Sequence, residues 1–388
     1  MEYELHSDDR LFQEEVRDWI AAHKPAEPRP PENDPAALAY DRAWQRTLYD
    51  GGWAGLDWPE KYGGRGLSLM RQMIWMQEIA RQNAPTAPDL YVGLNHGGPT
   101  LIALGTGAQK AFHLGPILRG DAVWCQGFSE PGAGSDLAAI RTRAVVDGDH
   151  LVVSGQKIWT SFAHFADYQE LLVRTGTGPK KHDGLTWVIC DMKTPGITVR
   201  PIFDMAGGHH LNEVFYDEAR IPLANVVGAV NEGWKTAMCT LGFERGMGMV
   251  GLQIEMARLV EELIAHAREH RGSDGRRLIE REDLGAHLAT LRAEVAALRA
   301  MAYMNISRHE RGVAGLEATM AALHQAELER KVTRTALAMI GARGLELTQQ
   351  HDDWSRRYLW SFPMTIAGGT SQIRRNIIAE RILGMPRS

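Results

Sequence analysis

The chain has 388 residues, of which 44% are hydrophobic and 23% charged, so it can bury a large core in two or three structural units. Its formal net charge of −5 gives no basic surface for nucleic acid. No apolar run reaches the ~20 residues that a transmembrane helix needs, and the polar, acidic start gives no secretory signal. We therefore expect a soluble, cytoplasmic protein without nucleic-acid or membrane partners.

The first third of the chain is predicted to be helical. Hydrophobic residues recur on one helical face at Leu11, Val16 and Ile20, and the proline-rich stretch 25–35 ends that helix. Three further helices are expected, at 36–50, 68–82 and 97–115. Together these segments predict a helical domain over residues 1–122.

The middle of the chain changes to a strand pattern. Residues 143–146 and 151–154 flank the turn Asp147-Gly148-Asp149, which is typical of a β-hairpin. Further strand-like runs follow at 171–174, 185–190, 197–202 and 212–216. Glycine and proline separate these runs, so we expect a β-rich domain over residues 123–232.

From Gly233 onward the hydrophobic period returns to 3.6 residues. Apolar positions line single helical faces at Leu252, Met256, Leu259, Val260 and Leu263, at Leu288, Leu291, Val295 and Leu298, and at Leu323, Leu328, Val332 and Met339. A final helix is expected at 371–383, with Thr370 as its N-cap. Residues 233–388 are thus predicted to form a four-helix bundle, and the fold class is α+β.

The cysteines and histidines show no metal-site pattern. Cys125, Cys190 and Cys239 are widely spaced, and their odd number argues against a disulfide framework. The pairs His209-His210 and Asp352-Asp353 stand outside any His-Glu-x-x-His sequence. No strand-linked Gly-x-Gly-x-x-Gly predicts a Rossmann nicotinamide site. We expect a protein of a reducing compartment without a bound metal.

Two polar segments together predict a site for a large planar ring. Residues 128–136 form a glycine-rich turn with two hydroxyls, and glycines let backbone N–H groups approach a ligand closely. Residues 155–161 place the indole of Trp159 beside two more hydroxyls. Alone, the first is more often a plain loop and the second a core or surface filler. Their combination favours a cofactor site.

These two motifs and the C-terminal run 367–376 stand in an order that resembles the acyl-CoA dehydrogenase family of flavoenzymes. The resemblance covers nearly the whole chain. It implies an N-terminal helical domain, a middle β-barrel or sandwich and a C-terminal helical bundle. It also implies FAD as cofactor, an acyl-CoA substrate in lipid metabolism, electron-transferring flavoprotein as acceptor, and a homodimer or homotetramer.

The resemblance also assigns cofactor contacts residue by residue. In the first two motifs the flavin contacts would be Gln126, Phe128, Ser129, Gly134, Ser135, Trp159, Thr160 and Ser161. Ser135 would also lie near CoA. In the family the adenosine half of FAD reaches a neighbouring subunit, and the matching residues here are Arg271, Gly341, Ala342, Thr370 and Gln372.

The catalytic base is expected at one of two family positions. Many members carry a Glu before the Gly-Thr of the C-terminal signature, and this chain has Gly368 there. A subset instead uses a Leu-x-x-Glu-Arg pattern, which places the base at Glu244 and a CoA contact at Arg245. The alternative for Glu244 is a surface acid near a helix N-terminus, where the macrodipole favours it. The backbone N–H of Gly368 would donate to the thioester oxygen.

Other reactions on the same scaffold stay open. An acyl-CoA oxidase would pass electrons directly to oxygen, and a silent flavin-binding subunit would serve an active partner in a mixed oligomer. A nucleic-acid-binding member is disfavoured by the negative net charge. The acyl group itself is undetermined, so straight, branched and ring-bearing chains are all compatible with the sequence.

Overall fold

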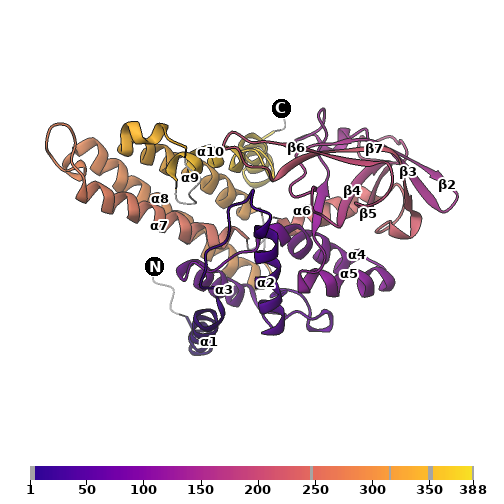
Figure 1. The fold of residues 1–388 in the computed structure, drawn as a ribbon, viewed down its shortest axis with the longest axis horizontal. Helices are drawn as coiled ribbons and strands as arrows, with labels where there is room; N and C mark the ends of the chain where they lie inside the picture. The colour runs from indigo at the N-terminus through magenta and orange to yellow at the C-terminus, as the bar shows by residue number, and fades with distance from the viewer. Residues whose placement is uncertain (1–4, 245–247, 314–315, 348–352, 387–388) are drawn as a thin grey trace. The chain divides into compact units, whose positions relative to one another are not determined.

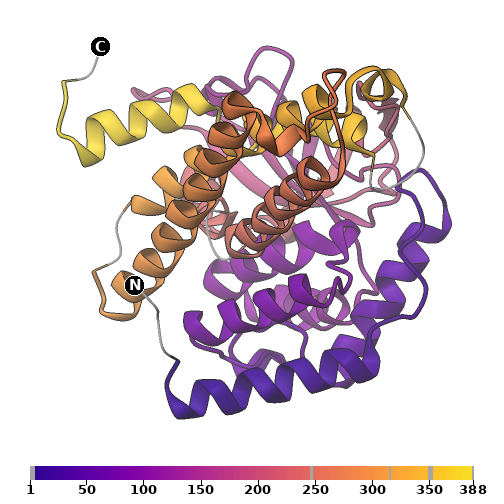
Figure 2. The same ribbon diagram turned by 90° about the vertical axis from the view of Figure 1, so that its left-hand side faces the viewer.

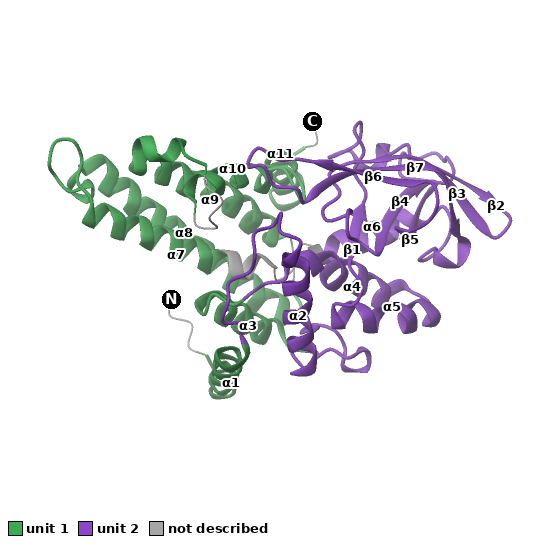
Figure 3. Ribbon diagram, in the orientation of Figure 1, with its two compact units in different colours: residues 1–23, 67–84, 245–388 green, residues 24–66, 85–244 purple. Residues whose placement is uncertain are grey.

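The computed structural model describes residues 5–244, 248–313, 316–347 and 353–386. The chain divides into two compact units, each built from segments that are distant in sequence (Figure 3). Unit 1 comprises 1–23, 67–84 and 245–388, and unit 2 comprises 24–66 and 85–244.

Unit 2 contains the middle helices and the whole sheet (Figure 1). Its helical elements are α2 (Ala36–Asp50), η1 (Glu60–Tyr62), η2 (Pro88–Leu90), η3 (Gly93–Gly97), α4 (Gly98–Leu104), α5 (Gly107–Arg119), η4 (Leu137–Ala139), η5 (Leu223–Asn225) and α6 (Gly233–Glu244). The single helix predicted at 97–115 is divided, because Thr106 and Gln109 form a capping box that starts α5 anew.

The sheet of unit 2 has seven strands and is curled. They are β1 (Trp124–Gly127), β2 (Arg143–Asp147), β3 (His150–Lys157), β4 (Tyr168–Arg174), β5 (Leu185–Asp191), β6 (Ile197–Ile202) and β7 (Leu211–Pro222). The order is β1-β4-β2-β3-β7-β6, and β5 pairs with β4. The predicted hairpin is confirmed, because Asp147 pairs with His150 around Gly148, whose φ of 60° suits the tight turn.

Large aromatic side chains fill the core of unit 2. Trp58, Trp124 and Trp187 are at most 1% exposed and belong to one hydrophobic cluster. Helix α6 packs on β5 within this unit. Cys125 and Cys190 face the same residue, Gln169, from the two strands that flank β4, and both are buried.

Unit 1 is helical (Figures 1 and 2). Its elements are α1 (Ser7–His23), α3 (Leu69–Arg81), α7 (Gly248–Glu269), η6 (Leu278–Glu280), α8 (Glu282–Glu310), α9 (Glu317–Ile340), η7 (Gly341–Leu345), α10 (Trp354–Met364), α11 (Ser371–Ile377) and η8 (Ile378–Ile382). Helices α7, α8 and α9 pack side by side, and α10 packs on α9. The predicted helical bundle is confirmed.

Most of the apolar positions predicted in unit 1 are buried, whereas Leu323 is half-buried and the side chain of Leu252 lies outside the described residues. Leu259, Leu291 and Leu328 are at most 2% exposed in the shared core of α7, α8 and α9. The prediction for Leu11 is wrong, because its side chain is 65% exposed and Phe12 is buried instead. Phe12 is four residues before Val16, which is one helical turn, whereas a spacing of five residues leaves the face.

None of the helices in the described ranges is long and apolar enough to cross a membrane. Within the same residues, no group of three or more His, Cys, Asp or Glu could hold a metal ion.

Candidate flavin site

The first predicted flavin segment begins on strand β1 with Gln126. Its Nε2 donates to Glu170 Oε1 on the neighbouring strand β4 at 2.7 Å. Glu170 is fully buried, and the same oxygen lies 3.3 Å from His96 Nδ1. The amide of Gln126 is therefore oriented by a buried carboxylate behind it.

The loop after β1 keeps an open face. Phe128 is buried and Ser129 half-buried, whereas Gly134 and Ser135 are exposed. Glu130 and Ala133 exchange two backbone hydrogen bonds of 3.0 Å, which closes the turn. An added Cβ at Gly134 would meet nothing within 4 Å, so this part of the loop leaves space for a ligand.

Trp159 in the second segment has a strained backbone. Its φ is 62°, in the left-handed region that a bulky residue adopts only when its surroundings impose it. The next residue supplies that constraint, because Thr160 N donates to Asn212 O at 3.0 Å and Asn212 Nδ2 donates to Thr160 O at 3.1 Å. As a result the indole of Trp159 stays 57% exposed.

The two segments meet directly. The backbone N–H of Ile158 donates to Ser129 O at 3.0 Å. The hydroxyl oxygen of Thr160 is buried and has no hydrogen-bond partner among the residues that the structure describes, and Ser161 beside it is half-buried. A buried unpartnered hydroxyl is available to bind a ligand, and an exposed indole offers a face for stacking. Both features fit a planar ring with a polar rim, such as a flavin.

Two charged residues outside the predicted flavin contacts, Lys157 and Glu130, bind this loop on its buried side. Lys157 is fully buried at the end of β3, and its Nζ lies 2.9 Å from both Phe128 O and Glu130 Oε1. Burial lowers the pKa of Lys157 to about 8, although Glu130 opposes that shift. Burial would raise the pKa of Glu130, but Lys157 and hydrogen bonds from Arg141 and Thr142 lower it overall. In the sequence, the signal for this pair was an acidic residue in the first motif together with a lysine at an inward-facing strand position in the second.

The residues predicted for the adenosine end belong to unit 1, where Arg271 lies on a loop, Gly341 and Ala342 begin η7, and Gln372 lies in α11. Arg271 is exposed, and its Nη1 donates to Gly275 O at 2.7 Å within its own loop. Gly341 has a φ of 61°, and Ala342 beside it is exposed. Gln372 is also exposed.

The C-terminal signature forms a helix start. Thr370 caps α11 as predicted, because its Oγ1 accepts from Ile373 N at 3.1 Å. The neighbouring hydroxyl of Ser371 is buried without a partner. Gly368 and Gly369 have φ values of 62° and 99°, which favour glycine at both positions.

The predicted base lies at the edge of the described residues. Glu244 is the last described residue of α6, and residues 245–247 before the start of α7 lie outside the described ranges. Its side chain and all of Arg245 lie outside the described residues. Their roles therefore stay predictions.

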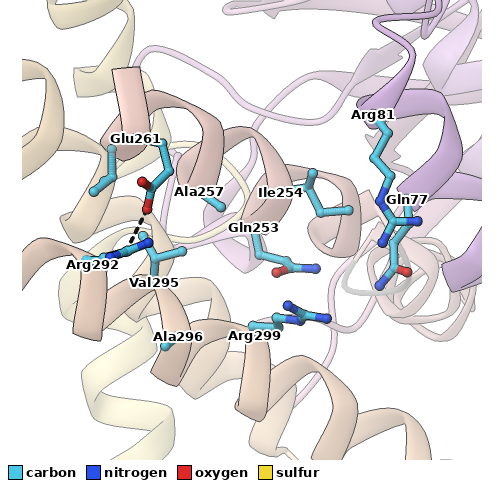
Figure 4. Close-up of a pocket in the computed structure, with 11 residues that line it drawn as sticks. Gln77, Arg81, Gln253, Ile254, Ala257, Glu261, Arg292, Val295, Ala296 and Arg299 are labelled. Carbon is cyan, nitrogen blue, oxygen red and sulfur yellow. Dashed lines mark ion pairs between the residues drawn. The ribbon is translucent and has the colours of Figure 1, made fainter. Parts of the chain in front are cut away.

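A cavity of about 340 Å³ lies among α3, α7 and α8 of unit 1 (Figure 4). Its walls combine apolar side chains such as Ala257 and Val295 with polar and charged ones, and Glu261 pairs with Arg292 at 2.6 Å on one side. None of the residues predicted to bind flavin lines this cavity. A more open cavity of about 810 Å³ borders the loop that follows Arg271.

Three family models cover most of the chain. They are described as the acyl-CoA dehydrogenase N-terminal domain (residues 6–121), middle domain (125–218) and C-terminal domain (231–383). The chain is 38% identical over 383 residues to acyl-CoA dehydrogenase IpdE1 of Mycobacterium tuberculosis (strain ATCC 25618 / H37Rv), covering 97% of both proteins.

Solved structures agree with this match. A protein described as the Tcur3481-Tcur3483 steroid ACAD has a TM-score of 0.86 at 30% identity, with both chains fully covered. The ChsE4-ChsE5 complex from Mycobacterium tuberculosis has a TM-score of 0.84 at 32% identity, again with full coverage of both chains.

The fold and the paired motifs define an oxidoreductase of the flavoprotein class. The chain belongs to the acyl-CoA dehydrogenase family and is an enzyme of that family. Family membership implies a flavin cofactor.

Proposed function

We propose that this enzyme uses FAD to oxidise an acyl-CoA thioester to the 2-enoyl-CoA. The observation that carries the proposal is the junction of the two motifs. Ile158 binds Ser129, Trp159 is held exposed in a strained backbone, and the Thr160 hydroxyl is buried without a partner. Contacts within the chain itself hold this geometry, which supports a preformed ring site.

The proposed chemistry assigns three tasks to the chain. Bound FAD supplies the acceptor for the hydride that leaves the β-carbon. Glu244 removes the α-proton as a carboxylate base, so the two electrons of the α C–H bond form the new double bond. The backbone N–H of Gly368 donates to the thioester oxygen and stabilises the negative charge that develops there. Trp159 and Thr160 hold the ring in place.

Cofactor identity is tested first. The purified protein should be yellow, and denaturation should release FAD rather than FMN. The chain reconstituted with FAD should then be bleached by a good acyl-CoA substrate under anaerobic conditions. A folded protein that binds no FAD after reconstitution excludes the proposal. Rapid formation of peroxide in air would instead favour the oxidase alternative.

The acyl group is proposed to carry a ring system. A relative of 30% identity is described as a steroid ACAD, and it matches the full length of this chain. A panel of straight, branched and polycyclic acyl-CoA esters with an artificial electron acceptor would rank the substrates by kcat/KM. A clear preference for straight-chain esters would contradict this assignment. Electron-transferring flavoprotein is the proposed physiological acceptor.

The assembly is proposed to be a dimer or tetramer in which FAD lies between chains, and a mixed oligomer is the second candidate. Two relatives are described as pairs of different chains. Light scattering gives the mass of the isolated chain with and without FAD. If the isolated chain oxidises acyl-CoA as a homo-oligomer, the alternative of a silent subunit is excluded. If a monomer binds FAD normally, the sharing of FAD between chains is excluded.

A further inference from the structure

The two flavin motifs are joined by a buried ion pair at the base of the loop. Lys157 is the last residue of β3, and its ammonium group is completely shielded from solvent. It donates to Phe128 O and to Glu130 Oε1, both at 2.9 Å. One side chain of the second motif therefore binds two separate parts of the first motif.

The carboxylate of Glu130 binds the other end of the same loop. Its Oε2 accepts from Arg141 N at 2.6 Å and its Oε1 accepts from Thr142 N at 2.8 Å. Glu130 is 8% exposed, so these bonds form away from water. Charge-assisted bonds of this kind are stronger than neutral ones, and they fix the positions of both ends of the loop.

These hydrogen bonds also fix the positions of the residues that are predicted to contact the flavin ring. Ile158, next to Lys157, donates to Ser129 O at 3.0 Å, and Trp159 follows with its left-handed backbone. Phe128 and Ser129 on one side and Trp159 on the other are thus set by the same few bonds. If Lys157 moved, both walls of the predicted ring site would move with it.

The ion pair does more than fill space in the core. Well-packed apolar side chains of similar volume usually stabilise a fold as well as a buried ion pair or better, because charges lose their hydration on burial. Here the ion pair serves polar groups that an apolar pair would leave unbound, namely the carbonyl of Phe128 and the amides of Arg141 and Thr142.

We propose that Lys157 and Glu130 are positioning residues for the flavin, which set its affinity and reduction potential by fixing the two ring-binding motifs against each other. The proposal rests on the proposed function, because it concerns FAD bound at that site. Neither residue is proposed to react with substrate.

The test compares Lys157→Met with the double variant Lys157→Met/Glu130→Gln. The double variant leaves no unpaired buried charge, and the side-chain carbonyl of the introduced glutamine still accepts from one of the two backbone amides. Its Nε2 group cannot accept from the other amide, so we expect the double variant to unfold at a lower temperature than the wild type. Three quantities are measured on folded protein, well below the unfolding midpoint. They are the FAD dissociation constant, the visible spectrum of bound FAD and its reduction potential.

Both variants should bind FAD roughly tenfold or more weakly, as expected for the loss of a buried charged hydrogen bond. At saturating FAD they should show a shifted spectrum and a shifted potential. Lys331→Met is the matched control, because Lys331 pairs with Glu294 at 2.9 Å on the surface of α8 and α9. It should leave all three quantities unchanged.

The outcomes separate the two claims. If the folded double variant binds FAD with wild-type affinity, spectrum and potential, the ion pair serves only folding and this inference is overturned. If the wild-type protein itself binds no FAD, the proposed function fails instead.

Discussion

The two regions predicted to contact FAD differ in how far a single chain builds them. In unit 2, the ring-binding motifs are fixed by Lys157, by the Ser129–Ile158 bond and by Asn212, largely away from solvent. In unit 1, four of the five residues predicted for the adenosine end are exposed, Thr370 is half-buried, and Arg271 binds a carbonyl of its own loop. The predicted ring contacts are thus held by bonds within one chain, whereas most of the predicted adenosine contacts lie on the surface, as the proposed sharing of FAD between subunits would require.

The largest expected effect tests the base. Glu244→Gln keeps the size of the side chain but removes its basicity, so the reduction of bound FAD by acyl-CoA should slow by roughly a hundredfold or more. Anaerobic stopped-flow bleaching of the flavin measures this step, and FAD affinity should stay unchanged. A variant that is reduced as fast as the wild type shows that Glu244 is not the base.

The next prediction compares buried carboxylates in the two units. Glu130 in unit 2 has Lys157 as a partner, whereas burial in the bundle raises the pKa of Glu329 to about 7, with Arg357 opposing that shift. The folded state therefore binds the Glu329 proton more tightly than the unfolded state does. Its contribution to stability is complete below about pH 4.5 and is lost as the pH rises through 7.

Glu329→Gln removes this titration. The variant should match the wild type near pH 4.5 and exceed its free energy of unfolding by roughly 3 kcal/mol at pH 8. Urea unfolding at the two pH values measures the difference. An equal effect of the substitution at both pH values would contradict the raised pKa.

The third prediction concerns Trp159, one of the predicted ring contacts in unit 2. Trp159→Ala removes the exposed indole, and the loss of one stacking face should weaken FAD binding by about tenfold. Alanine keeps the Cβ and with it the strain of the left-handed backbone, and the lost indole is 57% exposed, so the thermal stability of the apoprotein should change little. Fluorescence titration with FAD and thermal unfolding without FAD give the two values. A loss of apoprotein stability with unchanged FAD affinity would make Trp159 a folding residue.

The smallest effect concerns Gly368 in the C-terminal signature of unit 1. Gly368 has a φ of 62°, so Gly368→Ala should lower the free energy of unfolding by about 1 kcal/mol. The same strain would apply to a Glu at this position, so a base moved from residue 244 to residue 368 should restore only part of the rate. Urea unfolding checks the alanine variant, and no change in stability would show that the backbone adapts.

Local patterns in the sequence predicted much of the fold. The hairpin around Gly148 and the N-cap at Thr370 follow from short segments whose residues bond to one another. The helix at 97–115 was predicted as one element because its apolar residues continue past the capping box at Thr106. Leu11 fits the core by its hydrophobic side chain alone, but its spacing of five residues from Val16 places it on another face of the helix, where it is exposed.

The candidate site was predicted less completely, because it depends on contacts between distant segments. The motif predicts Trp159 and Thr160 as flavin contacts. It does not predict the left-handed backbone of Trp159 or the hydrogen bonds between Thr160 and Asn212. The pairing of Lys157 with Glu130 joins positions 27 residues apart in the chain. Such a pairing requires the strand register, which only the folded sheet defines.

The unequal burial of the cysteines gives the enzyme a natural labelling site. Burial raises the pKa of the thiols of Cys125 and Cys190 inside the sheet, which protects them from alkylation in the folded state. Cys239 is half-buried on α6, the helix that ends at Glu244. A limiting amount of a fluorescent maleimide should therefore label Cys239 first. The fluorophore would then report, without any engineered residue, when a substrate reaches the end of that helix.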